Sequence, residues 1–194
     1  MLTQLYLIRH GETAWSLTGR HTGRTDLPLT EKGERDARRL AERLRPVSFS
    51  EVLSSPRLRA CQTCSLAGFA NEYKTEADLA EWDYGKYEGM RTDEIRAKHP
   101  GWNVFKDGCP GGESPDEASE RIDRLIQKLR TRKGRIALFS HGHIGRVIAT
   151  RWIGEPVLQA RHLLLDAASI SVLSHEHDDP EAPVISLWNE VAGG

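Results

Sequence analysis

The 194-residue sequence has few cysteines, no long apolar segment and almost no net charge. Its three cysteines are an odd number, too few for a disulfide framework, and they favour a reducing compartment. No segment approaches the roughly 20 apolar residues that cross a bilayer, and the chain does not start with a basic signal region. The formal net charge of -1 provides no basic field for nucleic acid or acidic membranes. We therefore expect a soluble, cytoplasmic protein that binds neither nucleic acid nor membranes.

The order of the predicted elements is typical of an α/β protein. Short buried strands are expected at residues 5–8, 51–54, 135–139, 169–174 and 184–188. Helices are expected from 30 to 46, 55 to 68, 92 to 98, 114 onward and 144 to 152. Ser55 is the expected N-cap of the second helix, and Ser114 and Glu117 are expected to form a capping box at the start of the fourth. Strands that alternate with helices predict one domain over residues 1–194, a three-layer α/β/α sandwich with a mostly parallel central sheet.

Arginine and histidine side chains recur where the predicted strands end. Arg9 and His10 end the first strand, Arg59 lies near the start of the helix after the second, and His141 follows the strand at 135–139. The carboxyl ends of parallel strands meet at one edge of a sheet, where α/β proteins bind ligands, so these groups can converge. Two arginines and two histidines are costly to bury without an anion, and phosphate matches guanidinium geometry. The sequence thus predicts a phosphate site beside His10.

Glu81 is the best candidate for a proton donor near this site. It lies in Leu79-Ala80-Glu81-Trp82, and apolar neighbours can keep a carboxyl group protonated near neutral pH. The loop at residues 16–23 adds hydroxyl groups and Arg20, but lacks the Gly-Lys-Ser/Thr of a Walker loop. A surface carboxylate and an ordinary polar loop are the alternative interpretations of these two segments.

The segment from Leu7 to Thr13, Leu-Ile-Arg-His-Gly-Glu-Thr, resembles the LxRHGET signature of the histidine phosphatase superfamily, which has a phosphoglycerate mutase-like fold. Four later segments resemble further blocks of that family in the same order: 22–30, 54–63, 81–85 and 140–142. Together the five blocks extend from residue 5 to about 155. This resemblance implies the same fold and a covalent phosphohistidine mechanism.

The resemblance also implies roles for individual residues. His10 attacks phosphorus, Glu81 protonates the leaving group, and the phosphoryl oxygens are held by Arg9, Arg59 and His141. Substrate contacts are expected from Ser16, Arg20, Thr22, Gly23, Tyr84 and His143. No metal ion or other cofactor is expected, and the expected partner is a small-molecule phosphate ester.

Hydrolysis is favoured over transfer of phosphate within one molecule. Mutases of the family carry a long insertion after the Tyr-Gly block, with paired arginines for the substrate carboxylate. Here the segment between Gly85 and Ser114 is short, and its only arginines are Arg91 and Arg96. The sequence variants resemble a branch that acts on sugar phosphates, including bisphosphates. A cofactor-dependent phosphoglycerate mutase is the alternative.

Two further alternatives belong to other functional classes. His141-Gly142-His143 is a His-x-His motif, which metal hydrolases use, although Arg9 would repel a metal ion there. A non-catalytic member could bind phosphate or a protein, but such members usually lose the nucleophile or an arginine. Strands at residues 169–188 could form an exposed sheet edge, so both a monomer and a homodimer are consistent with the sequence.

Overall fold

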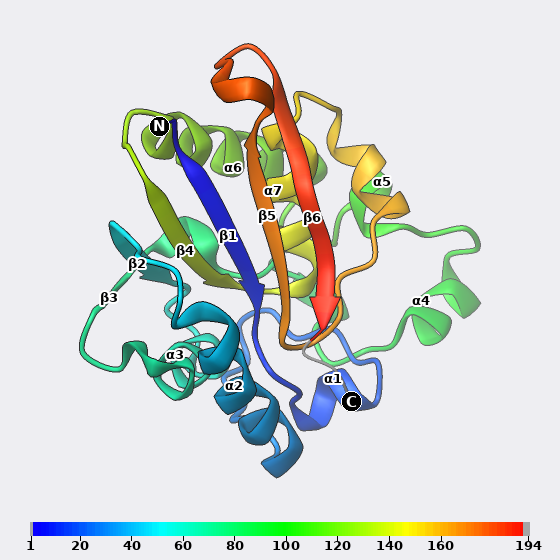
Figure 1. The fold of residues 1–194 in the computed structure, drawn as a ribbon. Helices are drawn as coiled ribbons and strands as arrows, with labels where there is room; N and C mark the ends of the chain where they lie inside the picture. Colours follow the sequence, from blue (N-terminus) through cyan, green and yellow to red (C-terminus); the bar gives the residue numbers. More distant parts are fainter. Residues whose placement is uncertain (1, 192–194) are drawn as a thin grey trace.

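A six-stranded sheet of order β3-β2-β4-β1-β5-β6 runs through the computed structural model, which describes residues 2–191 (Figure 1). Its strands are β1 (Gln4–Arg9), β2 (Glu51–Ser54), β3 (Tyr73–Thr75), β4 (Arg135–Ser140), β5 (Ser169–His175) and β6 (Pro183–Val191). The four strands β3, β2, β4 and β1 are parallel, whereas β5 and β6 pair antiparallel. This confirms the predicted mostly parallel sheet, and adds the short edge strand β3, which the sequence analysis missed.

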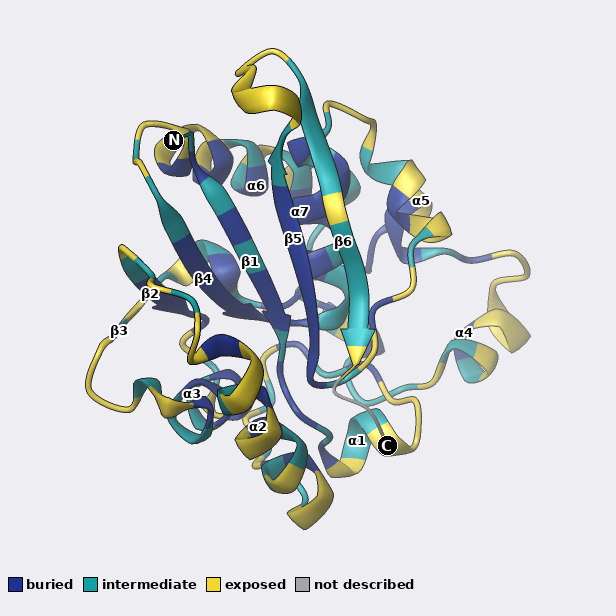
Figure 2. Ribbon diagram, viewed as in Figure 1, coloured by how far each residue is buried: buried dark blue, intermediate teal, exposed yellow. Residues whose placement is uncertain are grey.

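Helices cover both faces of the sheet and make the predicted three layers (Figure 1). The main helices are α2 (Glu31–Leu44), α3 (Leu58–Cys64), α6 (Pro115–Arg130) and α7 (Gly142–Trp152). Leu7 and Leu138 pack in one apolar core with α6 and α7, whereas Ile8 and Phe139 pack with α2 and α3 on the other face. Successive strand residues therefore serve opposite cores, and the middle strands are buried (Figure 2).

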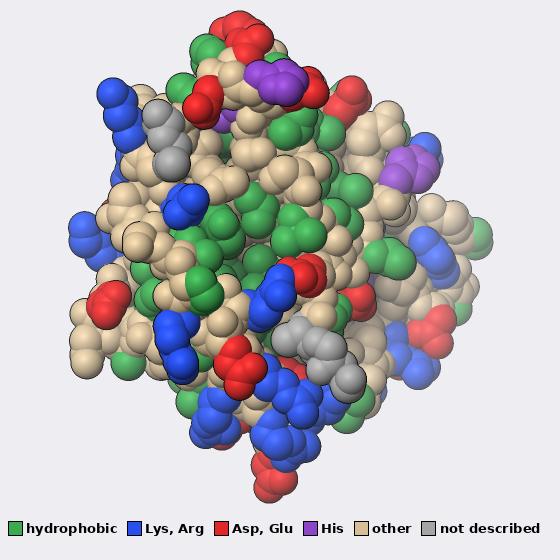
Figure 3. Space-filling view, in the orientation of Figure 1, with side chains coloured by type: hydrophobic (Ala, Val, Ile, Leu, Met, Phe, Trp, Pro, Cys, Tyr) green, Lys and Arg blue, Asp and Glu red, His purple; other side chains and the backbone are tan. Residues whose placement is uncertain are grey.

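Shorter helices and turns connect these layers. They are α1 (Ala14–Leu17), α4 (Thr92–Lys98), α5 (Val104–Asp107), η1 (Ser65–Phe69), η2 (Ala77–Leu79), η3 (Gly85–Tyr87), η4 (Val157–His162) and η5 (Glu176–Asp178). The helices α2 and α3 leave part of their sheet face uncovered, and apolar side chains gather there in a hollow (Figure 3). No helix within residues 2–191 is both long and apolar enough to cross a membrane.

Two predicted helix starts behave differently. Ser114 caps α6 in the expected capping box with Glu117, and Pro115 is the first helical residue. By contrast, α3 begins at Leu58, three residues after the predicted cap at Ser55. The Ser55 N–H donates to the Phe139 carbonyl at 2.8 Å, so this residue continues the strand pairing, and Arg57 takes the N-cap position. The helix after β4 begins at Gly142, slightly earlier than predicted.

The first turn of α2 packs directly on the loop that follows His10. Thr30 caps this helix, and its N–H also donates to the Glu12 carbonyl at 2.9 Å. A Cβ atom at Gly33 would lie 2.2 Å from the Glu12 carbonyl oxygen, and one at Gly11 would lie 2.5 Å from the Gly33 carbonyl oxygen. The close approach of these two backbones therefore requires glycine at both positions.

We expect Gly33→Ala to destabilise the protein by about 1–3 kcal/mol, because the added methyl group has no room against the Glu12 carbonyl. This loss opposes a gain of about 1 kcal/mol in helix propensity. Urea unfolding measures the difference. Glu42→Ala, on the exposed side of the same helix, is the control and should change stability by less than about 0.5 kcal/mol. A Gly33→Ala protein as stable as wild type would contradict the close contact.

Candidate active site

The ends of three parallel strands bring the predicted arginines and histidines together. The His10 N–H, at the end of β1, donates to the Ser140 carbonyl at 3.0 Å, which aligns this end with that of β4. The rings of His10 and His141 consequently lie 5.1 Å apart, measured between centroids. Arg59 reaches the same place from the first turn of α3, and its side chain is fully buried. The convergence expected from strand order is therefore present in the structure.

His10 is held as a neutral imidazole with one nitrogen free. Its Nδ1 lies 2.7 Å from the Gly11 carbonyl, which can only accept, so Nδ1 carries the proton and Nε2 has a free lone pair. Burial lowers the pKa of His10 well below its ordinary value, and the positive charges of Arg59 and Arg9 lower it further. The ring is thus available as a nucleophile or base across the neutral pH range.

Three buried nitrogens around His10 have no hydrogen-bond partner within the described residues: Arg9 Nε, Arg59 Nε and His141 Nδ1. The other atoms of these groups are held by the protein, since Arg9 donates to the Leu165 carbonyl and His141 Nε2 lies 2.7 Å from the Ser55 hydroxyl. Burial lowers the pKa of both arginines. Buried donors without acceptors are costly, and phosphoryl oxygens are acceptors of the right charge.

The backbone of the predicted substrate loop holds Arg59 in place. The guanidinium donates to the carbonyls of Thr22 at 2.8 Å, Gly23 at 3.2 Å and Thr25 at 3.0 Å. The Gly23 N–H donates to the Glu88 carboxylate at 2.9 Å. The N–H and the carbonyl of Gly23 are thus both bound within the protein, and Gly23 does not line the cavity that opens beside His10. Its place in the structure is behind Arg59, whereas the expectation was direct contact with substrate.

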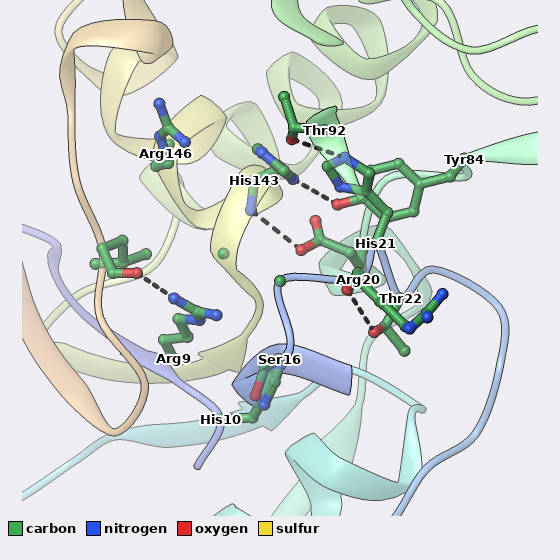
Figure 4. Close-up of a pocket in the computed structure, with 14 residues that line it drawn as sticks. Arg9, His10, Ser16, Arg20, His21, Thr22, Tyr84, Thr92, His143 and Arg146 are labelled. Atoms are coloured by element: carbon green, nitrogen blue, oxygen red, sulfur yellow. Dashed lines mark hydrogen bonds between the residues drawn. The ribbon is translucent and has the colours of Figure 1, made fainter. Parts of the chain in front are cut away.

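A cavity of about 260 Å³ opens beside His10 (Figure 4). Five of the six predicted substrate-contact residues line it: Ser16, Arg20, Thr22, Tyr84 and His143. His21, Thr92 and Arg146 also line it, and the sequence analysis assigned none of them. His21 lies inside the predicted loop, and Arg146 lies one helical turn after His143 on α7, so helical spacing was the available signal for the arginine.

Neutral polar rings form one wall of the cavity. The Tyr84 hydroxyl hydrogen-bonds to His143 Nδ1, and the His21 ring stacks on Tyr84 with centroids 4.7 Å apart (Figure 4). Burial lowers the pKa of His21 to about 4 and holds the pKa of His143 well below its ordinary value. Thr92 Oγ1 lies 3.2 Å from His21 Nε2. This wall offers hydrogen bonds without charge, which suits hydroxyl groups of a ligand.

The Glu81 side chain lies against the N-terminus of α7, and its carboxylate lines the cavity. It accepts backbone N–H groups of Trp82 at 2.9 Å, His143 at 3.1 Å and Ile144 at 2.9 Å. These three N–H groups fix the position of the carboxylate at the edge of the cavity.

The histidines of this site should make the protein less stable in acid. The pKa values of His10, His21, His141 and His143 are all lowered in the folded state, so unfolding takes up protons once the pH falls below about 6.5. The contribution of these neutral histidines to the free energy of unfolding is fully present above that pH and is lost as the pH falls below it. For each histidine, the slope reaches about 1.4 kcal/mol per pH unit.

Urea unfolding between pH 7.5 and pH 5 measures this effect. We expect the free energy of unfolding to fall over the range, and His21→Gln to make the fall shallower. His162→Gln, which changes an exposed histidine, should leave the slope as in wild type. Stability that is constant or rises toward pH 5 would contradict the neutral, buried state of these rings.

Comparisons with known proteins agree with this geometry. The profile of the histidine phosphatase superfamily (branch 1) matches residues 5–190. An acid phosphatase of Mycobacterium tuberculosis is 40% identical over 188 residues, covering 95% of this chain and 92% of its own. The sedoheptulose 1,7-bisphosphatase of Saccharomyces cerevisiae is 33% identical over 245 residues, covering 93% and 90%. A Salmonella choleraesuis protein named "Probable phosphoglycerate mutase GpmB" is 34% identical over 185 residues, covering 90% and 86%.

A solved structure shows the same fold. The protein of a Mycobacterium tuberculosis open reading frame superimposes with a TM-score of 0.91 at 35% identity, covering 98% of this chain and 99% of its own. Both the profile match and the curated relatives span nearly the whole chain, so the resemblance inferred from five ordered blocks is confirmed. The chain belongs to branch 1 of the histidine phosphatase superfamily.

Proposed function

We propose that the chain hydrolyses small phosphomonoesters, sugar phosphates or bisphosphates among them, through a phosphohistidine on His10. One observation carries this proposal: a neutral His10 with a free Nε2 faces buried donors of Arg9, Arg59 and His141 that lack acceptors. A nucleophile surrounded by unpaired donors is what transfer of a phosphoryl group requires. The phosphatase names of two curated relatives support the same reaction.

The first step forms a bond between His10 Nε2 and phosphorus while the ester P–O bond breaks. Arg9, Arg59 and His141 stabilise the charge on the three equatorial oxygens, and Glu81 gives its proton to the leaving oxygen. In the second step Glu81 takes a proton from water, water attacks phosphorus and the P–N bond breaks. The products are the free alcohol and inorganic phosphate.

The segment between Gly85 and Ser114 supports hydrolysis over a mutase reaction. Arg91 forms an ion pair with Asp93 at 3.1 Å, and Arg96 donates to the Trp102 carbonyl at 2.9 Å. Both arginines are thus occupied, and neither lines the cavity beside His10. An arginine pair for a substrate carboxylate has no counterpart in these contacts.

We propose that residues 1–194 form one domain and that the protein is cytoplasmic. Its reaction needs no metal ion. Cys61, Cys64 and Cys109 are free thiols, which suits a reducing compartment. Within residues 2–191, no three histidine, cysteine, aspartate or glutamate side chains gather in a way that could hold a metal ion. The β6 strand lies at a sheet edge, and we propose a monomer or a homodimer.

We expect His10→Ala to lose at least about 10⁴-fold in kcat, because His10 is the proposed nucleophile that forms the covalent intermediate. Quenching the wild type with ³²P-labelled substrate in alkaline detergent should trap a label that is stable to alkali and labile to acid, as phosphohistidine is. His162→Ala, at an exposed histidine, is the control and should label like wild type. Undiminished hydrolysis by His10→Ala would overturn the covalent mechanism.

A substrate panel tests the reaction class. We expect kcat/KM to be highest for sugar phosphates or bisphosphates, with inorganic phosphate released and full activity in excess EDTA. Phosphoglycerates and nucleotides complete the panel. Interconversion of phosphoglycerates with retention of phosphate would favour the mutase, metal-dependent turnover would favour a metal hydrolase, and no turnover of any ester would favour a binding protein.

A further inference from the structure

An ion pair between Glu113 and Arg121 lies behind Glu81, outside the cavity that contains His10. Arg121 extends from α6, and its Nε and Nη2 each donate to one Glu113 carboxylate oxygen at 2.7 Å. The two side chains are 12% and 14% exposed. A bidentate pair this well buried holds a fixed geometry, unlike the exposed ion pairs of α2.

Arg121 also binds the backbone that precedes Glu81. Its Nη1 donates to the carbonyls of Asp78 at 2.7 Å and Ala80 at 2.9 Å. The turn η2 ends at Leu79 and no helix or strand begins before η3, so the backbone here has no ladder of its own. The guanidinium therefore fixes the residues just before Glu81.

Glu113 binds the backbone and side chain that follow Glu81. Its carbonyl accepts Trp82 Nε1 at 2.9 Å, and its N–H donates to the Asp83 carbonyl at 2.8 Å. These two contacts come from the Glu113 main chain, and its carboxylate also accepts the Asp83 N–H at 3.4 Å. The ion pair thus connects the Asp78 and Ala80 carbonyls, before Glu81, to Asp83, after it. The Glu81 carboxylate itself is bound by N–H groups at the start of α7. Two helices consequently define where the carboxylate lies.

The Glu113–Arg121 pair lies beside a different cavity from the one that contains His10. A second cavity of about 470 Å³ is lined by Glu113 and Arg121, and Glu81 lines both this cavity and the one beside His10. None of the contacts of the pair reaches His10, Arg9, Arg59 or His141. The pair can therefore influence Glu81 without touching the groups that would hold the phosphoryl oxygens.

We propose that Glu113 and Arg121 are positioning residues for the proton donor Glu81, a role that rests on the proposed function of Glu81. They fix the carboxyl group where it can reach the leaving oxygen. General acid catalysis contributes about 10²–10⁴-fold, and a displacement of about 1 Å can cost about 10²-fold. Loss of the pair should thus lower kcat/KM, which reports the first step, only for esters whose leaving group needs a proton.

A second ion pair provides a matched control. Arg151 on α7 donates from Nε and Nη2 to both carboxylate oxygens of Asp123 on α6, each at 2.8 Å. This pair has the same bidentate form and also belongs to α6, but its remaining contact is the Glu155 carbonyl. The Asp123–Arg151 pair does not touch residues 78–83. A variant of this pair therefore measures the effect of losing an ion pair on α6 without displacing Glu81.

The test compares kcat/KM for two phosphate esters in Arg121→Lys and Arg151→Lys. An alkyl ester such as glycerol phosphate leaves as a poor alkoxide and needs a proton, whereas 4-nitrophenyl phosphate leaves as a stable anion. We expect Arg121→Lys to lower kcat/KM by about 10- to 100-fold for the alkyl ester and by less than about threefold for the aryl ester. Arg151→Lys should change the ratio of the two values by less than about twofold.

Glu81→Gln separates this proposal from the function on which it rests. It should show the same discrimination between esters, and adding Arg121→Lys to it should produce no further loss with the alkyl ester. Equal losses for both esters in Arg121→Lys, or the same discrimination in Arg151→Lys, would overturn the positioning role. A Glu81→Gln protein without discrimination would instead overturn the assignment of Glu81 as proton donor. Should Arg121→Lys not fold, Glu113→Gln undergoes the same comparison.

Discussion

The parallel pairing of β1, β2 and β4 is the constraint on which the rest of the structure depends. It places the ends of these strands in register, and the residues that follow each strand are forced into one small volume. Arg9, His10 and His141 come from the strand ends themselves, whereas Arg59 arrives one turn into α3. A site of high positive potential is therefore a consequence of topology, and the surrounding loops serve to hold it.

Electrostatics decides what this concentration of donors can do. Burial and the two neighbouring guanidinium groups lower the pKa of both imidazoles, so His10 keeps a free lone pair while the arginines carry the positive charge. Glu81 is the only carboxylate that lines the cavity beside His10 among the described residues, and backbone N–H groups of α7 hold it. The proposed nucleophile, the positive charge and the proposed proton donor thus occupy separate positions, each fixed by a different element.

Local sequence signals predicted what depends on local structure. The strand after residue 134, the capping box at Ser114 and the histidines at strand ends could all be read directly, because hydrophobic runs and caps act over a few residues. The predicted start of α3 was wrong. The Ser55 N–H pairs with β4 and the Ser55 hydroxyl with His141, and neither partner is near Ser55 in sequence. The three residues of β3 lack a clear apolar pattern.

Contacts across long sequence distances explain what the sequence could not predict in the site. Gly23 was predicted to contact substrate, and nothing near it in sequence indicates that its carbonyl binds Arg59 and its N–H binds Glu88, 65 residues away. The wall formed by His21, Tyr84 and His143 joins three segments that no helical or strand period relates. The Glu113–Arg121 pair was not predicted, because the backbone groups that it binds at residues 78–83 lie far upstream in the sequence.

The unpaired donors around His10 also have a kinetic consequence. They complement any tetrahedral oxyanion, and the inorganic phosphate released by hydrolysis has the same shape and charge as the group that binds at the start. The site therefore cannot hold the phosphoryl group of a substrate strongly without also retaining the product. Departure of phosphate sets an upper limit on turnover, and the concentration of free phosphate around the enzyme affects its rate.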